Sequence, residues 1–439
     1  PVGLFLLYYL FAGISDNVLA YQIPAWLFAS ATAWVIARIA ARWTNAQGAL
    51  LAGASYLFML GPLEGFGGQT PVFYNLMIAG AAWLVLQSLP ALDAGKPGWR
   101  MLAAMALAGA ALTFKQTTMF EAAFFGLFAA WRLWQSDVNR WRAAGWIAVW
   151  IIVGLAPTAS AAAWYAIHGY WASYYSAMVT ANLKKTNPSV IEIATSALAL
   201  ILRLYPILAI SLLGLKLPDQ PKSPRTDVLF SLLWIAASIC GIATIPNFYT
   251  HYALPGLAPI VVLCGLAMGR REIGVFLFAF VAAFTLLLYP ALNTSDHRQS
   301  INGMAAMSEA IREHGGERGV LIYDGPPLLY VMSRTHPLSP LAFPPHLNHW
   351  RERNVSQFNT QREVINILQK QPGVIVTTVT PTYTPGNGQT RQIVMDYAFN
   401  NCQLILAKPS FDLTSYALIA IFADCAPRPY TTEVRFDRR

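Results

Sequence analysis

Residues 193–215, IATSALALILRLYPILAISLLGL, form an apolar run in which Arg203 is the only charged side chain. A helix needs about 20 predominantly apolar residues to cross the hydrocarbon core of a bilayer, so this run predicts a membrane-spanning helix. Similar runs lie on both sides of it. Together they predict ten spans, near residues 18–41, 47–61, 71–89, 101–114, 117–133, 143–167, 193–215, 227–246, 251–268 and 272–290.

The composition agrees with this pattern. The chain has 439 residues, of which 56% are hydrophobic and 12% charged, whereas soluble domains carry about 25% charged residues. Beyond residue 293 no run of membrane-spanning length occurs. The sequence therefore predicts an α-helical polytopic membrane protein with about ten spans over residues 1–290, followed by a soluble α/β domain over residues 291–439.

The first residue is Pro1 and no signal peptide precedes it, so we expect the sequence to lack its true N-terminus. The opening segment PVGLFLLYYLFAGIS (1–15) is too short to span comfortably, and it is expected to lie as an interfacial helix.

The links between the spans alternate in charge. One alternate set contains 12 cations, and the other set contains only Lys115, Lys184 and Lys185. The cations of the first set are Arg38, Arg42, Lys96, Arg100, Arg132, Arg140, Arg142, Lys216, Lys222, Arg225, Arg270 and Arg271. Because cytoplasmic links are enriched in Lys and Arg, the first set is expected inside the cell and the C-terminal domain outside. The predicted location is the inner (plasma) membrane of a bacterial cell, with an extracytoplasmic C-terminal domain.

The formal net charge of +9 does not indicate a nucleic-acid-binding protein. Residues 1–290 hold 16 Lys and Arg against 9 Asp and Glu, while residues 291–439 hold 14 against 12. The positive excess therefore lies in the membrane region, where it sets topology. No basic stripe interleaved with aromatic residues is present, so a nucleic-acid partner is excluded.

The C-terminal region alternates short helical and strand patterns. Helices are expected at MAAMSEAIREHGG (304–316), PPLLYVMS (326–333), TQREVINILQK (360–370) and RQIVMDYAFNN (391–401). Strands are expected at GVLIYD (319–324), GVIVTTV (373–379), CQLILA (402–407) and YALIAIF (416–422). This alternation predicts a small α/β layer domain.

The four cysteines fall into two groups. Cys240 and Cys264 lie in predicted spans, where a small hydrophobic role is expected. Cys402 and Cys425 bracket the last two strands. If these strands form an antiparallel hairpin centred near Leu413, the two thiols face each other at its open end, and a disulfide is expected in an oxidising compartment. Two free buried thiols are the alternative.

Polar residues at the external ends of the spans are the candidates for chemistry, because charged groups near a membrane are costly. Glu64 lies in the glycine-rich link LEGFGGQTP, where a plain loop carboxylate is the alternative. Lys115, with Gln116 beside it, suits a lipid phosphate, although a lysine can also reach the headgroups without specificity. Arg203 is expected deep inside a span, held either by a phosphate or by a structural carboxylate. His251 in NFYTHY (247–252) suits acid–base or phosphate contact, but lone histidines are more often structural.

Two further groups are weaker candidates. Lys184 and Lys185 could attract an anionic headgroup, and a solvated pair is the more ordinary interpretation. His346 and His349 form an HxxH pattern near His336, but no helix or cysteine supports zinc geometry, so no metal site is assigned and a divalent metal is left open as a cofactor. No Walker loop, nucleotide fingerprint or GxSxG elbow occurs.

Several segments, taken in order, resemble the GT-C membrane glycosyltransferases of the protein-mannosyltransferase and aminoarabinose-transferase type (glycosyltransferase families 39 and 83). The first is PVGLFLLYYLFAGISDNVLAYQIPAWLF, at the family's proline pair and second helix. The others are GASYLFMLGPLEGFGGQTPVFYNLMIAG, ALAGAALTFKQTTMFEAAFFGLF and NFYTHYALPGLAPIVVLCGLAM, the last of which is similar to the family's late HY-x-L-P helix. The resemblance covers residues 1–290 well and residues 291–439 loosely.

The resemblance implies transfer of a sugar from a polyprenyl-phosphate carrier to a lipid, glycan or protein acceptor on the extracytoplasmic face, by inverting displacement. It matches Lys115 to the family's carrier-phosphate lysine, and more loosely Arg203, His251 and Tyr252 to further phosphate contacts. Glu64 and Gln69 match a polar external link near the active site. The family's acidic base is expected upstream of Pro1.

Two other functions compete with this interpretation. A transporter or flippase usually shows an internal repeat with paired broken helices at mid-membrane. No clear repeat is visible, and the polar candidates gather at the external ends. A non-catalytic assembly protein for envelope polysaccharide would keep sugar transfer intact when Lys115 is lost. The sugar and the acceptor cannot be read from the sequence.

Overall fold

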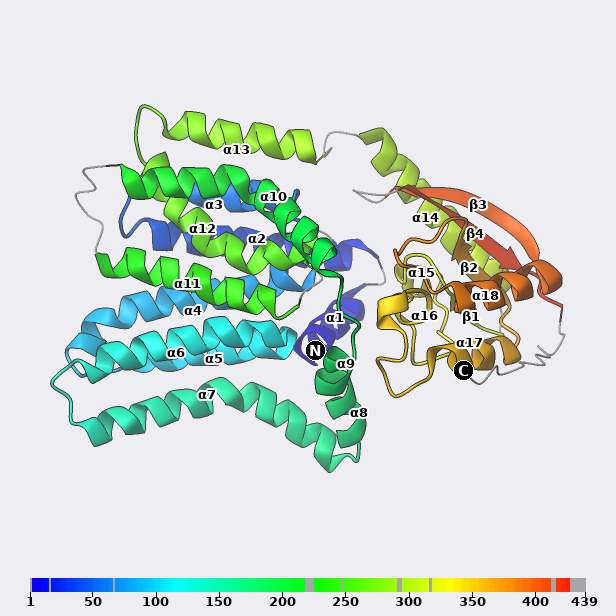
Figure 1. Ribbon diagram of the computed structural model, residues 1–439, viewed down its shortest axis with the longest axis horizontal. Helices are drawn as coiled ribbons and strands as arrows, with labels where there is room; N and C mark the ends of the chain where they lie inside the picture. Colours follow the sequence, from blue (N-terminus) through cyan, green and yellow to red (C-terminus); the bar gives the residue numbers. More distant parts are fainter. Residues whose placement is uncertain are drawn as a thin grey trace. The chain divides into compact units, whose positions relative to one another are not determined.

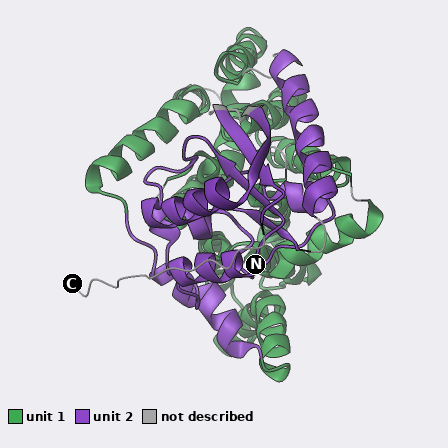
Figure 2. Ribbon diagram, turned by 90° about the vertical axis from the view of Figure 1, so that its right-hand side faces the viewer, with its two compact units in different colours: residues 1–169, 188–291 green, residues 170–187, 292–439 purple. Residues whose placement is uncertain are grey.

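The structure is a computed structural model that describes residues 2–15, 17–65, 68–217, 225–245, 248–289, 294–315, 318–411 and 416–426. It divides into two compact units, coloured separately in Figure 2. Unit 1 comprises residues 1–169 and 188–291, and unit 2 comprises residues 170–187 and 292–439. The sequence predicted a boundary at residue 290. The structure differs from this in grouping residues 170–187, within the predicted membrane region, with the C-terminal unit.

Unit 1 is helical (Figure 1). Its α-helices are α1 (Val2–Ile14), α2 (Leu19–Ala40), α3 (Ala46–Leu60), α4 (Thr70–Asp93), α5 (Trp99–Phe114), α6 (Met119–Trp134), α7 (Arg140–Ile167), α10 (Val190–Lys216), α11 (Arg225–Ala243), α12 (Leu254–Met268) and α13 (Gly274–Leu288). Two 3₁₀ turns, η1 (Gln116–Thr118) and η3 (Thr250–Ala253), lead into α6 and α12.

A helix lies at each of the ten predicted spans. Among the described residues, six helical segments are long and apolar enough to cross a membrane: Leu19–Ala40, Thr70–Asp93, Arg140–Ile167, Val190–Lys216, Thr226–Ala243 and Thr250–Met268. Helices α3, α5 and α13 are apolar but shorter. A membrane protein with several helical spans is therefore supported, while the number ten stays a prediction.

Helix α12 is the centre of unit 1. Every residue of α12 is buried, and α12 packs against α2, α3, α10 and α11. Small residues allow the closest of these approaches: a Cβ added at Gly48 of α3 would lie 2.5 Å from the carbonyl oxygen of Gly265. Helices in membranes pack closely at such small residues because their backbones can approach one another.

Two salt bridges join cationic links of unit 1 to other helix ends. The Arg42 guanidinium after α2 lies 2.6 Å from the Asp227 carboxylate at the start of α11. Arg132 at the end of α6 pairs with Asp93 at the end of α4. These contacts join links that the charge alternation assigned to one side of the membrane, so the path of the chain agrees with that alternation.

Unit 2 contains a four-stranded sheet in the order β1-β2-β4-β3. Strands β1 (Val320–Ile322) and β2 (Val374–Thr378) are parallel, and β4 (Tyr416–Ala423) runs antiparallel to both β2 and β3 (Gln403–Phe411). The remaining elements are α8 (Trp171–Tyr175), the π-helix η2 (Ser176–Thr180), α9 (Ala181–Leu183), α14 (Thr294–Gly315), α15 (Leu328–Met332), α16 (Pro345–Asn348), η4 (Trp350–Glu352), α17 (Thr360–Gln369) and α18 (Gly388–Asn401). The helices and strands expected from the sequence are present.

Both faces of the sheet are covered, because successive strand residues point to opposite faces. Val374 and Val376 of β2 pack with Ile311 of α14, whereas Ile375 packs with Val364 of α17. The result is a three-layer α/β/α arrangement, whereas the sequence predicted an α/β layer domain without the number of its layers.

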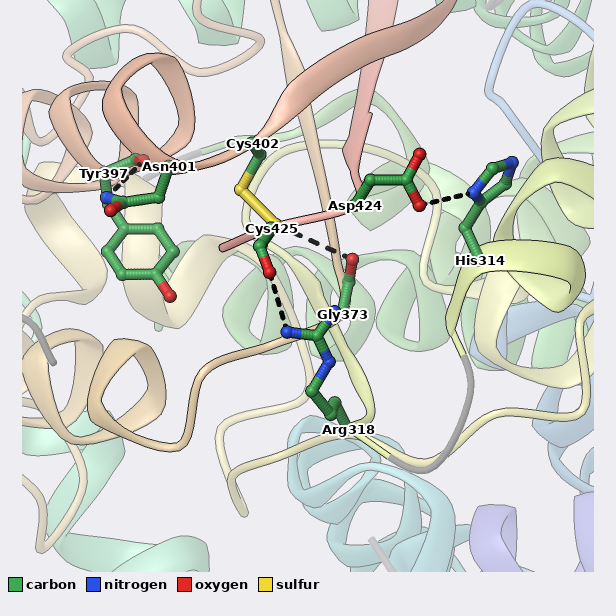
Figure 3. Close-up of a disulfide and its surroundings, with 8 residues drawn as sticks. All are labelled: His314, Arg318, Gly373, Tyr397, Asn401, Cys402, Asp424 and Cys425. Carbon is green, nitrogen blue, oxygen red and sulfur yellow. Dashed lines mark hydrogen bonds and ion pairs between the residues drawn. A yellow bond between two sulfur atoms is a disulfide. The ribbon is translucent and has the colours of Figure 1, made fainter. Parts of the chain in front are cut away.

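A disulfide joins Cys402, just before β3, to Cys425, just after β4 (Figure 3). It closes the open end of the hairpin, as expected; the turn at Leu413 lies outside the described residues. The carbonyl oxygen of Cys425 accepts a hydrogen bond of 2.7 Å from Arg318, and the neighbouring Asp424 lies 3.0 Å from Nδ1 of His314. The hydrogen bond from Arg318 therefore joins the end of β4 to the residues just before β1.

Candidate functional site

Glu64 lies in the link between α3 and α4, where the backbone leaves its ordinary conformation. Its φ of +55° is left-handed, which L-residues other than glycine seldom adopt. Its amide donates to the Gly61 carbonyl oxygen at 3.0 Å. Phe248, in the link before α12, also has a positive φ of 44°. Strained backbone of this kind clusters at functional sites, and here it marks two links that carry candidate residues.

The Glu64 carboxylate lies between two basic side chains from other elements. Its Oε1 is 3.6 Å from Nη1 of Arg203 on α10, and its Oε2 is 3.8 Å from Nδ1 of His251 in η3. Nη1 of Arg203 also donates to Oγ1 of Thr250 at 2.6 Å. Arg203 therefore has a carboxylate partner, one of its two predicted alternatives.

Arg203 lies at the middle of α10, a helix long and apolar enough to cross a membrane. Its guanidinium contacts two links, through Glu64 and Thr250. Helix α10 has 27 residues against 15 in α3, so its middle can lie beside the end of α3.

Lys115 and Tyr252 extend this group. The Lys115 Nζ lies 3.9 Å from the centre of the Tyr252 ring, a cation–π contact, and the rings of Tyr252 and His251 are 4.7 Å apart. A continuous series of contacts therefore runs from Lys115 through Tyr252, His251 and Glu64 to Arg203. We call these five residues the link cluster. Three links and one helix contribute to it, although their positions are up to 188 residues apart in the sequence.

Electrostatics favour an ionised Glu64. The neighbouring His251 lowers the pKa of the Glu64 carboxyl below its usual value, and the opposing effect of burial is smaller. The link cluster thus contains one carboxylate against the two cationic side chains Lys115 and Arg203. Cationic side chains of these two kinds suit an anionic ligand such as a phosphate.

A small cavity of about 10 Å³ adjoins the link cluster, enough for roughly one water molecule. Lys115, Tyr252, Tyr74 and Glu121 are among its lining residues. The Tyr74 hydroxyl is buried and has no hydrogen-bond partner among the described residues, so it is available to a ligand group.

The sequence interpretation missed Glu121. This carboxylate of α6 is 2% exposed and accepts hydrogen bonds from Nε1 of Trp234 at 2.7 Å and Oγ of Ser238 at 3.0 Å. A signal was present, since an acidic residue within a predicted apolar span is itself a functional candidate. Tyr74 had no such signal, because a buried tyrosine is ordinary in an apolar helix.

The other candidate residues named from the sequence are not part of the link cluster. Gln69 precedes α4 and makes no side-chain cap, and Gln116 opens η1 directly after Lys115. His349 is buried with its ring tilted against Tyr383, and His346 faces Glu352 at 3.7 Å. Among the described residues, no group of three His, Cys, Asp or Glu side chains is arranged to hold a metal ion.

A comparison with solved structures finds a similar fold. The crystal structure of ArnT from Cupriavidus metallidurans bound to undecaprenyl phosphate matches with a TM-score of 0.54 and 12% sequence identity, over 92% of this chain and 84% of that one. At this identity the similarity concerns the fold, and it supports the GT-C-like fold expected from the sequence. No protein-family model and no curated protein matches the chain.

Proposed function

We propose that this protein transfers a sugar from a polyprenyl-phosphate donor to an acceptor on the extracytoplasmic face of the membrane. The observation that carries the proposal is the link cluster: Lys115, Arg203, His251 and Tyr252, matched to phosphate contacts by the resemblance, form one continuous group with Glu64. The similarity in fold to ArnT, whose crystal structure contains undecaprenyl phosphate, is consistent with it.

The chemistry of the link cluster suits a phosphodiester at the ends of membrane helices. Lys115 offers a compact point charge, and the guanidinium of Arg203 offers a planar fork that matches phosphate oxygens. Glu64 and Thr250 hold Arg203, and the Tyr252 ring holds Lys115. Because these contacts fix the two cations before the ligand arrives, less conformational entropy is lost on binding.

In the proposed reaction the acceptor hydroxyl attacks the anomeric carbon of the donor sugar. The bond between that carbon and the phosphate oxygen breaks, the polyprenyl phosphate leaves with the electron pair, and the hydroxyl proton passes to a base. Charge develops on the leaving phosphate, so Lys115 and Arg203 would lower the barrier. The lowered pKa of Glu64 makes it a weak base, so we assign it the task of orienting Arg203 and His251.

Two other functions are alternatives to sugar transfer. A transporter or flippase would move the intact lipid-linked sugar across the bilayer, and an assembly protein would bind it without consuming it. The link cluster favours the transferase over the transporter, because four of its five members lie in links or in η3, next to the ends of α3, α5 and α12, and only Arg203 lies within a long helix.

The test is donor consumption by the protein reconstituted in liposomes. A panel of polyprenyl-phosphate-linked hexoses and pentoses would be supplied together with an extract of envelope lipids, glycans and proteins as acceptors. We expect release of polyprenyl phosphate from at least one donor, and a loss of about 100-fold or more in the Lys115→Ala variant, as for removal of a group that stabilises transition-state charge. The exposed Lys184→Ala substitution is the matched control.

Two results would contradict the proposal. One is that no donor is consumed and the lipid-linked sugar instead crosses the bilayer intact. The other is that Lys115→Ala, folded and inserted as the parent is, consumes the donor at the parent rate.

A further inference from the structure

Unit 2 contains a cavity of about 280 Å³ that is separate from the link cluster. Ligand pockets in proteins usually measure about 300–1,000 Å³, so this cavity suits a small ligand or one part of a larger one. It lies between the segment 173–185 and the segment 346–358. Its lining residues are Ser173, Ser176, Ala177, Ala181, Asn182, Lys185, His346, Glu352, Val355, Ser356, Gln357 and Phe358.

The charged groups of the cavity balance one another. Nζ of Lys185 lies 2.8 Å from Oε1 of Glu352, which forms a direct ion pair. Burial is the largest influence on His346 and lowers its pKa, so its imidazole is neutral near pH 7. One cation and one anion remain, and they are paired. A phosphate, which the sequence allowed as a partner of Lys185, would have to break this pair.

The remaining polar groups can both donate and accept hydrogen bonds. Three serines supply hydroxyl groups, and Asn182 and Gln357 supply amides. Oε2 of Glu352 and Nδ1 of His346 are buried and lack hydrogen-bond partners in the described part of the chain. Unsatisfied buried groups are costly, and a hydroxyl is able to donate to the first and accept from the second. The apolar lining includes Phe358, a flat surface for the C–H face of a ring.

We propose that this cavity binds a neutral saccharide. Vicinal hydroxyls match a lining of serines, amides and one carboxylate, whereas a free anion or cation finds both charged side chains already paired. A zwitterion such as an amino acid meets the same obstacle. The inference does not depend on the proposed transfer reaction, because it concerns binding by unit 2 alone.

The experiment measures saccharide binding by the full chain in lipid nanodiscs, which avoid sugar-based detergents. Saturation-transfer difference NMR would be recorded with neutral mono- and disaccharides of glucose, galactose, mannose, N-acetylglucosamine and arabinose. We expect at least one to bind. Ser173→Trp, at an exposed position whose side chain lines the cavity, should weaken that binding by about tenfold or more.

The matched control is Ala172→Trp, an exposed neighbour on α8 that does not line the cavity, and it should leave binding within about twofold of the parent. Lys115→Ala should also bind the saccharide normally, so failure of the transferase proposal would not remove this one. The inference is overturned if no saccharide of the panel binds, if Ser173→Trp and Ala172→Trp bind equally well, or if inorganic phosphate displaces the bound saccharide.

Discussion

Each unit of the molecule contains a carboxylate between a long-chain cation and a histidine. In unit 1, Glu64 lies 3.6 Å from Arg203 and 3.8 Å from His251. In unit 2, Glu352 lies 2.8 Å from Lys185 and 3.7 Å from His346. The same three kinds of side chain therefore occur twice, in surroundings that differ.

We expect these different surroundings to give the two trios different ligand preferences. The Glu64 side chain is 30% exposed. It belongs to a cluster that contains a second cation, Lys115, besides Arg203. The Glu352 side chain is 11% exposed, and its carboxylate is paired with the Lys185 ammonium at 2.8 Å. Burial lowers the pKa of His346 and so favours its neutral form, whereas the neighbouring His251 favours an ionised Glu64. We therefore expect a trio of this kind to favour an anion in unit 1 and a neutral polar ligand in unit 2.

The largest expected difference between the two trios appears when the cation of each is removed. Arg203→Ala should reduce donor consumption by about 100- to 1,000-fold, since it removes charge stabilisation from the leaving phosphate. Lys185→Ala should leave donor consumption within about twofold of the parent, because Lys185 belongs to the neutral cavity. Both rates would be measured in the liposome assay. Equal losses in the two variants would show that the trios do not differ in the way described.

The second effect concerns how unit 2 is held together. Cys402 and Cys425 are 23 positions apart, and closing a loop of this length in the unfolded chain stabilises the folded state by about 3 kcal/mol. Replacing both cysteines by serine should lower the free energy of unfolding of unit 2 by about that amount. Pulse proteolysis of the full chain would measure it.

Unit 1 should not respond to the same change, because its cysteines Cys240 and Cys264 are not disulfide-bonded. A fall in the protease resistance of α12 equal to that of β4 would contradict this separation of the two units.

The smallest effect is the pH dependence of the His346 trio. Burial lowers the pKa of His346 in the folded state, so the unfolded chain binds more protons at acidic pH. The stability of unit 2 should therefore be fully present above about pH 6.5, the ordinary value for histidine, and should fall as the pH decreases below it. His346→Gln should flatten this decrease, while substitution of the exposed His336 should not. A stability that rises on acidification would reverse the sign and refute the assignment.

Much of the fold was accessible from the sequence because its periodicities are long and unmixed. The apolar runs predicted a helix at each of ten positions, and alternating short patterns predicted the strands and helices of unit 2. The grouping of residues 170–187 with unit 2 was not accessible, since it depends on contacts such as Lys185 with Glu352 that join positions 167 residues apart.

The candidate site was predicted in part. Lys115, Glu64, Arg203 and His251 stood out because polar groups near apolar spans are costly, and the structure brings them together. The contact of Arg203 with two links could not be predicted, because hydropathy gives no measure of how far α10 extends beyond α3. Glu121 was overlooked, although its charge within an apolar helix was visible.

The most direct test of the central claim is the affinity of the link cluster for a lipid phosphate. Native mass spectrometry of the protein with undecaprenyl phosphate would compare the parent with Lys115→Ala, Arg203→Ala and the control Lys184→Ala. We expect binding by the parent and the control, and affinities lower by about tenfold or more in the other two. Equal affinities in all four proteins would contradict a phosphate-binding cluster.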